Sequence, residues 1–163
     1  MIDVAIFMGS KSDREKLSDA AVIFTDFGVS FEFHVCSAHR SPRYLLETLQ
    51  TLEKAGLQVV IAAAGGAAHL AGVCAAHTLL PVIGVPVDIP PLNGLDSLLS
   101  TVQMPGGIPV ATVSIGKAGA KNAALLAVAI LALKNDDLRQ RLSTYREEMA
   151  AGIEKQDREM NSK

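Results

Sequence analysis

The sequence has no tryptophan and few other aromatic residues, so its hydrophobic content must come from small and aliphatic side chains. Aromatic residues make up 4% of the 163 residues, whereas 49% are hydrophobic, and the mean hydropathy is +0.29. A chain of this length and composition can bury the core of one domain. Small side chains also let backbones approach closely, as they do in α/β proteins.

The sequence also has no excess of one charge. The formal net charge is -2, and there is no basic stripe and no basic amphipathic helix. This argues against nucleic acid as a partner and gives no support for membrane binding. The longest apolar run, about 123–133, is shorter than the roughly 20 residues of a bilayer span. The first residues are not those of a signal peptide. We therefore expect a soluble, cytoplasmic protein.

Cysteine is scarce, and no metal site is expected. Cys36 and Cys74 lie in apolar runs without the spacing of metal ligands, which favours buried free thiols in a reducing compartment. They are poor nucleophiles for the same reason. The four histidines lack acidic partners at ligand spacing, and we interpret His34 and His77 as structural.

Short apolar runs alternate with helical patterns along the whole chain. The predicted strands cover residues 4–8, 29–36, 57–64, 82–87 and 109–115. Helical patterns follow from about residue 12 to Gly28 and at 42–56, 67–80, 95–102, 120–133 and from 136. This alternation predicts an α/β three-layer sandwich with a parallel five-stranded, flavodoxin-like sheet. No linker is visible, so residues 1–163 form one predicted domain.

The run at 120–133 is apolar nearly all round, with only Lys121 and Asn122 as polar interruptions. A helix without a polar face must be buried on every side. One small sheet cannot cover it, so we expect the C-terminal helices, about 120–155, to contribute to subunit contacts. Residues from about Gly152 onward are expected to fray.

The segment Ser37-Ala38-His39-Arg40-Ser41-Pro42 has the pattern of a reactive centre. Ser41 suits an N-cap and Pro42 the first helical position, so His39 and Arg40 lie at a strand-to-helix turn, where anions are favoured. Arg40 and the helix terminus both disfavour an imidazolium, which suits His39 as a general acid–base. Arg40 can bind a phosphate or carboxylate with two hydrogen bonds. The alternative is a capping histidine beside a surface arginine.

Two further segments fall at strand ends on the same edge of the predicted sheet. Residues 9–13 are either a capping box of Ser12 and Glu15 or a phosphate-binding turn with Ser10. Asp13 would repel phosphate and suits a sugar hydroxyl or ring amine. In residues 65–70 the glycines either make a turn or admit a ligand, and His69 is either a core or a site histidine. Segments 104–107 and 116–119 are weaker candidates, the first as a connector or lid.

These segments, in this order, resemble one family. MGSKSD at 8–13, SAHRSP at 37–42, AAAGGAAHL at 62–70 and LDSLLSTVQMPGGIPVATVSIGKAGAKNAALLA at 95–127 are similar to class I N5-carboxyaminoimidazole ribonucleotide mutases. This is the family of the catalytic subunit of phosphoribosylaminoimidazole carboxylase. Arg40, rather than lysine, matches the mutase class. Ala71, in place of the family's usual proline, and the proline-rich loop 88–91 depart from the pattern.

The resemblance implies a function in purine biosynthesis without metal, cofactor or ATP. A carboxylate would move from the exocyclic nitrogen to ring carbon 4 of the ribonucleotide, with His39 as the acid–base. An aminoimidazole ribonucleotide carboxylase that uses free CO2, or a non-catalytic phosphoribosyl-binding module, remain alternatives. The resemblance also implies a homo-octamer, with active sites between subunits. The implied substrate-binding residues are Ser10, Ser12, Asp13, Ser37, Ala38, Arg40, Gly65, Gly66, Ala67, His69 and Leu70, and N–H groups of the 65–66 turn would hold the carboxylate.

Overall fold

The structure, a computed structural model, describes residues 2–162 and is built on one parallel sheet. Its strands lie in the order β2-β1-β3-β4-β5, with Ile6 of β1 between Phe33 and Ile61. This is the predicted flavodoxin-like order. The strands are β1 (Val4–Met8), β2 (Phe31–Val35), β3 (Val59–Gly65), β4 (Val82–Val87) and β5 (Ala111–Thr112).

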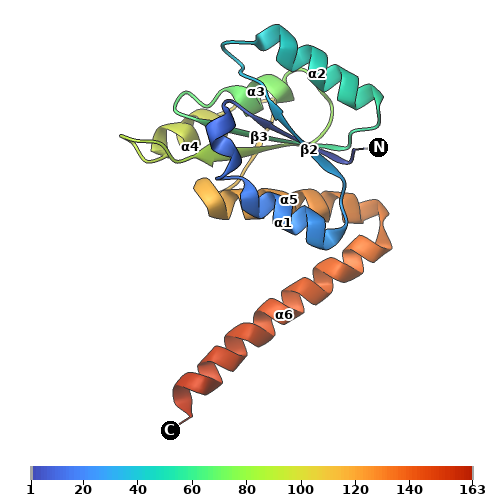
Figure 1. Cartoon of the computed structure of the whole chain (residues 1–163), viewed down its shortest axis with the longest axis vertical. Helices are drawn as coiled ribbons and strands as arrows, with labels where there is room; N and C mark the ends of the chain where they lie inside the picture. Colours follow the sequence, from blue (N-terminus) through green and yellow to red (C-terminus); the bar gives the residue numbers. More distant parts are fainter. Residues whose placement is uncertain (1, 163) are drawn as a thin grey trace.

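Helices cover both faces of the sheet, which confirms the three-layer prediction. Figure 1 shows α1 and α5 on one side and α2 and α3 on the other. Successive strand residues alternate between the two cores, so Ile61 packs toward α1 and α5 and Val60 toward α2 and α3. The helices are η1 (Lys11–Arg14), α1 (Ser18–Phe27), α2 (Pro42–Lys54), α3 (Leu70–Ala75), α4 (Leu95–Val102), α5 (Gly116–Leu131), η2 (Ala132–Lys134) and α6 (Asp136–Asn161).

Several elements are shorter than the sequence pattern predicts, three of them in ways that bear on the site or the sheet edge. The helix expected over 67–80 is only α3, six residues long, and the strand expected over 109–115 is the two residues of β5. The second strand covers 31–35 rather than 29–36. It is an edge strand, with Val35 48% exposed, so its apolar alternation does not reflect complete burial.

The apolar helix begins earlier than expected and is covered on one side only. With η2, α5 forms a 19-residue helical stretch, Gly116–Lys134, with a mean hydropathy of 1.4 and half of its residues buried. By length and composition this stretch can cross a membrane, so the argument from the length of the apolar run was wrong. Ala120, Ala123 and Ala127 are fully buried against the first core, the position of a core helix. Leu133 on the uncovered side is 73% exposed.

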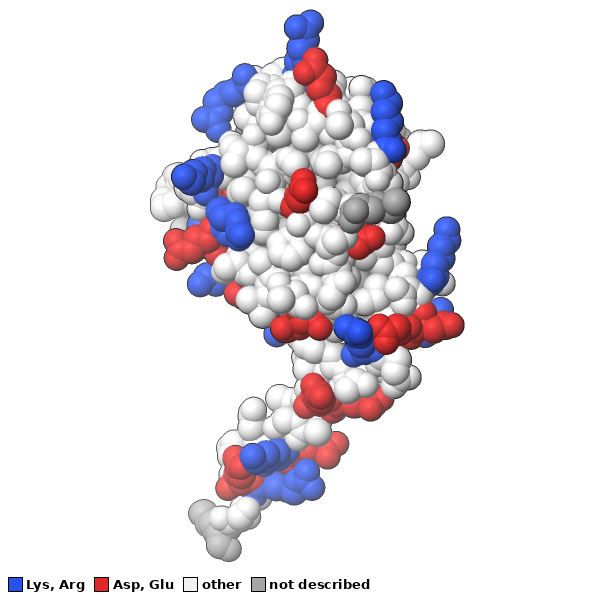
Figure 2. Space-filling view, turned by 45° about the vertical axis from the view of Figure 1, so that its right-hand side comes forward, with Lys and Arg blue, Asp and Glu red and all other residues white. Residues whose placement is uncertain are grey.

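The last helix, α6, continues well past the point where fraying was expected. It extends from the body of the molecule without interruption to Asn161 (Figure 1), and Leu138 is its one buried residue in the described part of the chain. Ion pairs four residues apart, Glu154 with Arg158 and Lys155 with Glu159, support the segment after Gly152. Figure 2 shows side chains of both charges along this projecting helix.

Candidate active site

The carboxyl ends of the first three strands surround a cavity of about 410 Å³. Of the twelve site residues proposed from the sequence, all but Gly66 line it. Segments 104–107 and 116–119 do not, nor do His34 and His77. The lining residues are Gly9, Ser10, Ser12, Asp13, Ser37, Ala38, His39, Arg40, Ala64, Gly65, Ala67, His69, Leu70 and Ile89.

The loop after β1 is held by a capping box, but not by the one predicted. Asp13 accepts a hydrogen bond from the Ser10 backbone N–H (3.1 Å), while the Ser10 hydroxyl accepts one from the Ser12 N–H (3.3 Å). The assignment to Ser12 and Glu15 was wrong, because the chain forms the short helix η1 before α1 begins. Burial raises the pKa of Asp13, and the nearby Ser10 N–H, Lys16 and Arg40 only partly offset this.

Arg40 connects the loops that follow β1 and β2. Its Nη2 donates to the Gly9 carbonyl at 2.7 Å and its Nε to the Ser37 hydroxyl at 3.4 Å. A guanidinium has five N–H groups, so three remain for an anion. Ser41 occupies the N-cap position of α2, yet its hydroxyl accepts from the Ser37 N–H (3.0 Å) and makes no capping bond to the helix. The predicted N-cap position is therefore confirmed, but the side chain caps no helical N–H and bonds across the His39 turn instead.

Two histidines meet across the cavity. His39 Nε2 lies 2.8 Å from His69 Nδ1, and the two rings are perpendicular with centroids 4.9 Å apart. One nitrogen must donate and the other accept, because two N–H groups cannot point at each other at this distance. At least one of the two rings is therefore neutral while this bond exists. The pair contains both an acid and a base, which suits proton transfer to and from a bound molecule.

The loop between β3 and α3 is fixed by serines of α4, a contribution that the sequence analysis missed. The Gly66 N–H donates to Ser97 Oγ (2.9 Å) and the Ala68 N–H to Ser100 Oγ (3.0 Å). The Gly66 N–H is therefore not available to hold a carboxylate as predicted. Within residues 2–162, the Ala67 N–H between them has no acceptor, and Ala67 lines the cavity.

A fourth wall comes from the loop after β4, which the sequence analysis noted without assigning to the site. Ile89 lies over Gly65 so closely that a Cβ there would be 3.1 Å from Ile89 Cδ1. Lys16 holds this loop through the Asp88 carbonyl and carboxylate, the latter at 3.0 Å. The hydrogen bond from Lys16 lowers the pKa of Asp88. The signal that could have found Ile89 is its position just beyond the carboxyl end of a buried strand.

Other reactive side chains offer no competing centre. Cys36 and Cys74 are free and buried, as predicted, and burial raises the pKa of Cys74 to about 12, so its thiol stays protonated. Across residues 2–162, no three His, Cys, Asp or Glu side chains are grouped so that they could hold a metal ion.

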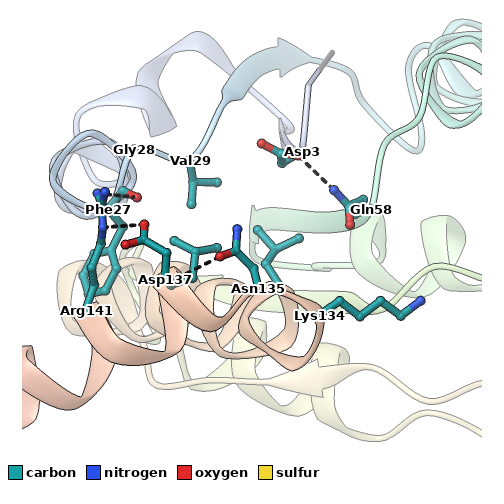
Figure 3. A pocket seen from close by; sticks show the side chains of 11 residues that line it. Asp3, Phe27, Gly28, Val29, Gln58, Lys134, Asn135, Asp137 and Arg141 are labelled. Carbon is teal, nitrogen blue, oxygen red and sulfur yellow. Dashed lines mark hydrogen bonds and ion pairs between the residues drawn. The ribbon is translucent and has the colours of Figure 1, made fainter.

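A second cavity, of about 310 Å³, lies at the opposite edge of the sheet, where Asp3 and Gln58 precede β1 and β3 (Figure 3). Both of its aspartates contact neighbouring side chains of the cavity wall. Gln58 donates to Asp3 at 2.9 Å, and Arg141 forms an ion pair with Asp137 at 2.9 Å. This cavity joins the base of α6 to the sheet and has no histidine, so the cavity at the carboxyl ends is the candidate active site.

Comparison with known proteins identifies the family. The family model for AIR carboxylase matches residues 3–152. The chain belongs to the AIR carboxylase family. Its fold is also that of a solved family structure, Treponema denticola PurE, with a TM-score of 0.89 and 27% identity over the full length of both chains.

Relatives in the AIR carboxylase family share more than half of the aligned residues. A Pyrococcus abyssi protein named N5-carboxyaminoimidazole ribonucleotide mutase is 56% identical over 91% of this chain and 84% of its own length. Proteins of the same name from Bacillus subtilis and Escherichia coli K12 are also 56% identical, over 88% of this chain and 89% and 85% of their own lengths.

Proposed function

We propose that this protein is an N5-carboxyaminoimidazole ribonucleotide mutase, an isomerase of purine biosynthesis. It moves a carboxylate from the exocyclic nitrogen of the substrate to carbon 4 of the imidazole ring. Family membership and relatives of that name at 56% identity support the reaction. The single structural observation that carries the proposal is the hydrogen-bonded pair of His39 and His69 inside a cavity at the carboxyl ends of the strands.

In this proposal His39 moves the proton. It protonates the exocyclic nitrogen as the carbon–nitrogen bond to the carboxylate breaks, and CO2 is released into the cavity. Carbon 4 of the ring then forms the new carbon–carbon bond, and His39 takes the proton that leaves this carbon. The proton taken up in the second step balances the one given in the first, so the enzyme returns to its starting state.

The other lining residues divide into polar and apolar walls. Arg40, Ser10 and Asp13 suit the phosphate and ribose, because a guanidinium binds phosphate and a carboxylate accepts from sugar hydroxyls. Ser12, Ser37 and Ala38 complete this wall. On the other side Ala64, Ala67 and Leu70 surround the migrating group with apolar surface, which keeps water from CO2. The Ala67 N–H, which has no acceptor in the described part of the chain, is a donor for its oxygens.

A substrate assay distinguishes the mutase from the two alternatives, a direct carboxylase and a phosphoribosyl-binding module. The purified enzyme is mixed either with the carbamate ribonucleotide or with aminoimidazole ribonucleotide and bicarbonate, and formation of the carbon-4 carboxylate is followed. The proposal expects turnover of the carbamate at low bicarbonate. Turnover that requires bicarbonate would favour the direct carboxylase, for which the family model is named. Binding of both ribonucleotides without turnover would leave only a phosphoribosyl-binding module.

We also propose a cytoplasmic homo-octamer with no nucleic-acid or membrane partner. Exposed apolar side chains on the C-terminal helices, Leu133 (73%), Met149 (55%) and Ile153 (66%), support subunit contacts. Helix α6 has one buried residue, Leu138, so packing within the chain stabilises it little. Packing against a partner subunit would stabilise it further. Light scattering after size exclusion tests this, with about 138 kDa expected for eight copies of a 17.2 kDa chain. A monomeric mass would reject it.

A further inference from the structure

Helix α4 directs two hydroxyl groups at the loop that carries His69. Ser97 is fully buried and its Oγ accepts from the Gly66 N–H at 2.9 Å while donating to the Val87 carbonyl at 2.8 Å. It therefore joins the carboxyl ends of β3 and β4. Ser100, one helical turn later, accepts from the Ala68 N–H at 3.0 Å. Its Oγ also lies 3.1 Å from the Gly66 carbonyl and 2.7 Å from that of Asp96.

These bonds hold the loop in a conformation that its own sequence does not favour. The segment from Ala67 to His69 continues an apolar helical pattern, and in isolation it would extend α3 backward by about a turn. In the structure α3 begins only at Leu70, and the Gly66 and Ala68 N–H groups that precede it donate to α4. Gly66 adopts the left-handed conformation (φ 64°) that starts this turn.

The held loop has a consequence for proton transfer. His69 is the residue after Ala68, and its Nδ1 makes the 2.8 Å bond to His39 Nε2. His69 is the N-cap of α3 and its carbonyl accepts from the Val73 N–H at 2.9 Å, so a shift of the loop before it would move the His69 ring away from His39. The same shift would move the Ala67 N–H, which lies between the two bonded N–H groups, from its place at the cavity wall.

We propose that Ser97 and Ser100 are positioning residues of the isomerase, which rests on the function proposed above. They touch no substrate. They fix the turn between β3 and α3 so that His69 orients His39 and the Ala67 N–H faces the migrating carboxylate. Removing either hydroxyl lowers turnover through this segment and not through binding of the ribonucleotide, because the phosphate and ribose contacts come from the loops after β1 and β2.

The test is a matched pair at Ser100, which is only partly buried: Ser100→Val and Ser100→Thr. The two new side chains have the same shape and differ in the hydroxyl. We expect S100V to lower kcat by about five- to tenfold with KM within about threefold, and S100T to keep kcat within about twofold of the original enzyme. Thr25→Val is the control, since Thr25 makes a similar bond within α1 (2.8 Å to the Ala21 carbonyl), away from the cavity.

Several results would overturn the proposal. Unchanged kcat in S100V would do so, as would equal losses in S100V and S100T, or a rise in KM with kcat maintained. Circular dichroism and thermal unfolding check that each variant folds. If S100V does not fold, Ser100→Ala and Ser97→Ala replace it, with the same loss of kcat at constant KM expected and unchanged kcat overturning the proposal.

A second readout separates this inference from the proposed function. Imidazole nitrogen shifts of the ligand-free enzyme should change for His39 and His69 in S100V and stay constant for His77, which bonds to Val73 outside the cavity. If the original enzyme does not isomerise the carbamate, the function fails, but these shifts still test the positioning. If the original enzyme and S100V are equally active and their shifts agree, only the positioning role is rejected.

Discussion

Replacing His69 tests how much of kcat depends on the orientation of His39, the side chain to which His69 is hydrogen-bonded. In His69→Ala the 2.8 Å bond to His39 Nε2 is lost, and His39, an exposed side chain, has no other hydrogen-bond partner among the described side chains. His39 would then sample its other staggered rotamers. We expect a moderate fall in kcat, because the proton carrier is still present but is less often in place.

The size of the effect follows from the bond that is lost. A hydrogen bond of this kind contributes about 1 kcal/mol to the preferred orientation, which corresponds to a factor of about five in population. His39 has about six combinations of its two side-chain torsions, so a free ring would be in the productive one about a sixth of the time. Both arguments give a five- to tenfold loss of kcat, far less than the 10²- to 10⁴-fold expected for loss of an acid–base group.

The assay is steady-state turnover of the carbamate ribonucleotide by His69→Ala, with His77→Ala as the control. His77 is exposed and bonds to the Val73 carbonyl outside the cavity, so its removal should leave kcat unchanged. A thousandfold loss in His69→Ala would refute the reasoning, because His69 would then be the proton carrier. No loss at all would show that the pair has no part in the reaction.

Three other predictions concern charge, anion binding and assembly. Burial raises the pKa of Asp13 above 3.8, so its ionised form costs stability at pH 7. Asp13→Asn should therefore resist denaturant at least as well as the original at pH 7, with an advantage that narrows as the pH falls toward 3.8; a widening advantage would contradict this. Arg40→Lys should raise KM more than it lowers kcat, since lysine lacks the two-pronged contact; a lower kcat at constant KM would argue against phosphate binding. Ile153→Asp should lower the native mass measured by light scattering, and an unchanged mass would exclude the end of α6 from subunit contacts.

Two of the buried strands, β1 and β4, were predicted to the residue, whereas β3 was expected at 57–64 and covers Val59–Gly65. The limits of β1 and β4 are those expected, because each is an unbroken apolar run bounded by a turn residue. The amphipathic pattern also gave both ends of α4. Continuation of α6 was missed because a single glycine, Gly152, costs a helix only about 1 kcal/mol, which good helix formers and ion pairs four residues apart offset.

Errors arose where residues distant in sequence decide the local structure. Residues 67–69 have a helical pattern, yet their loop bonds to serines about thirty positions later, which no local pattern reveals. The site residues were found because strand ends meet at one edge of a parallel sheet and because the motifs resemble a known family. The bond between His39 and His69 was not predicted, since it depends on side-chain geometry across two loops.

The most direct test of the central claim, that His39 carries the proton, is the turnover of His39→Asn. Asparagine keeps a polar group near His69 but cannot exchange a proton near neutral pH. We predict that kcat for the carbamate ribonucleotide falls by 10²- to 10⁴-fold while the dissociation constant measured by calorimetry stays within about threefold. Near-normal turnover, or lost turnover accompanied by lost binding, would contradict the assignment.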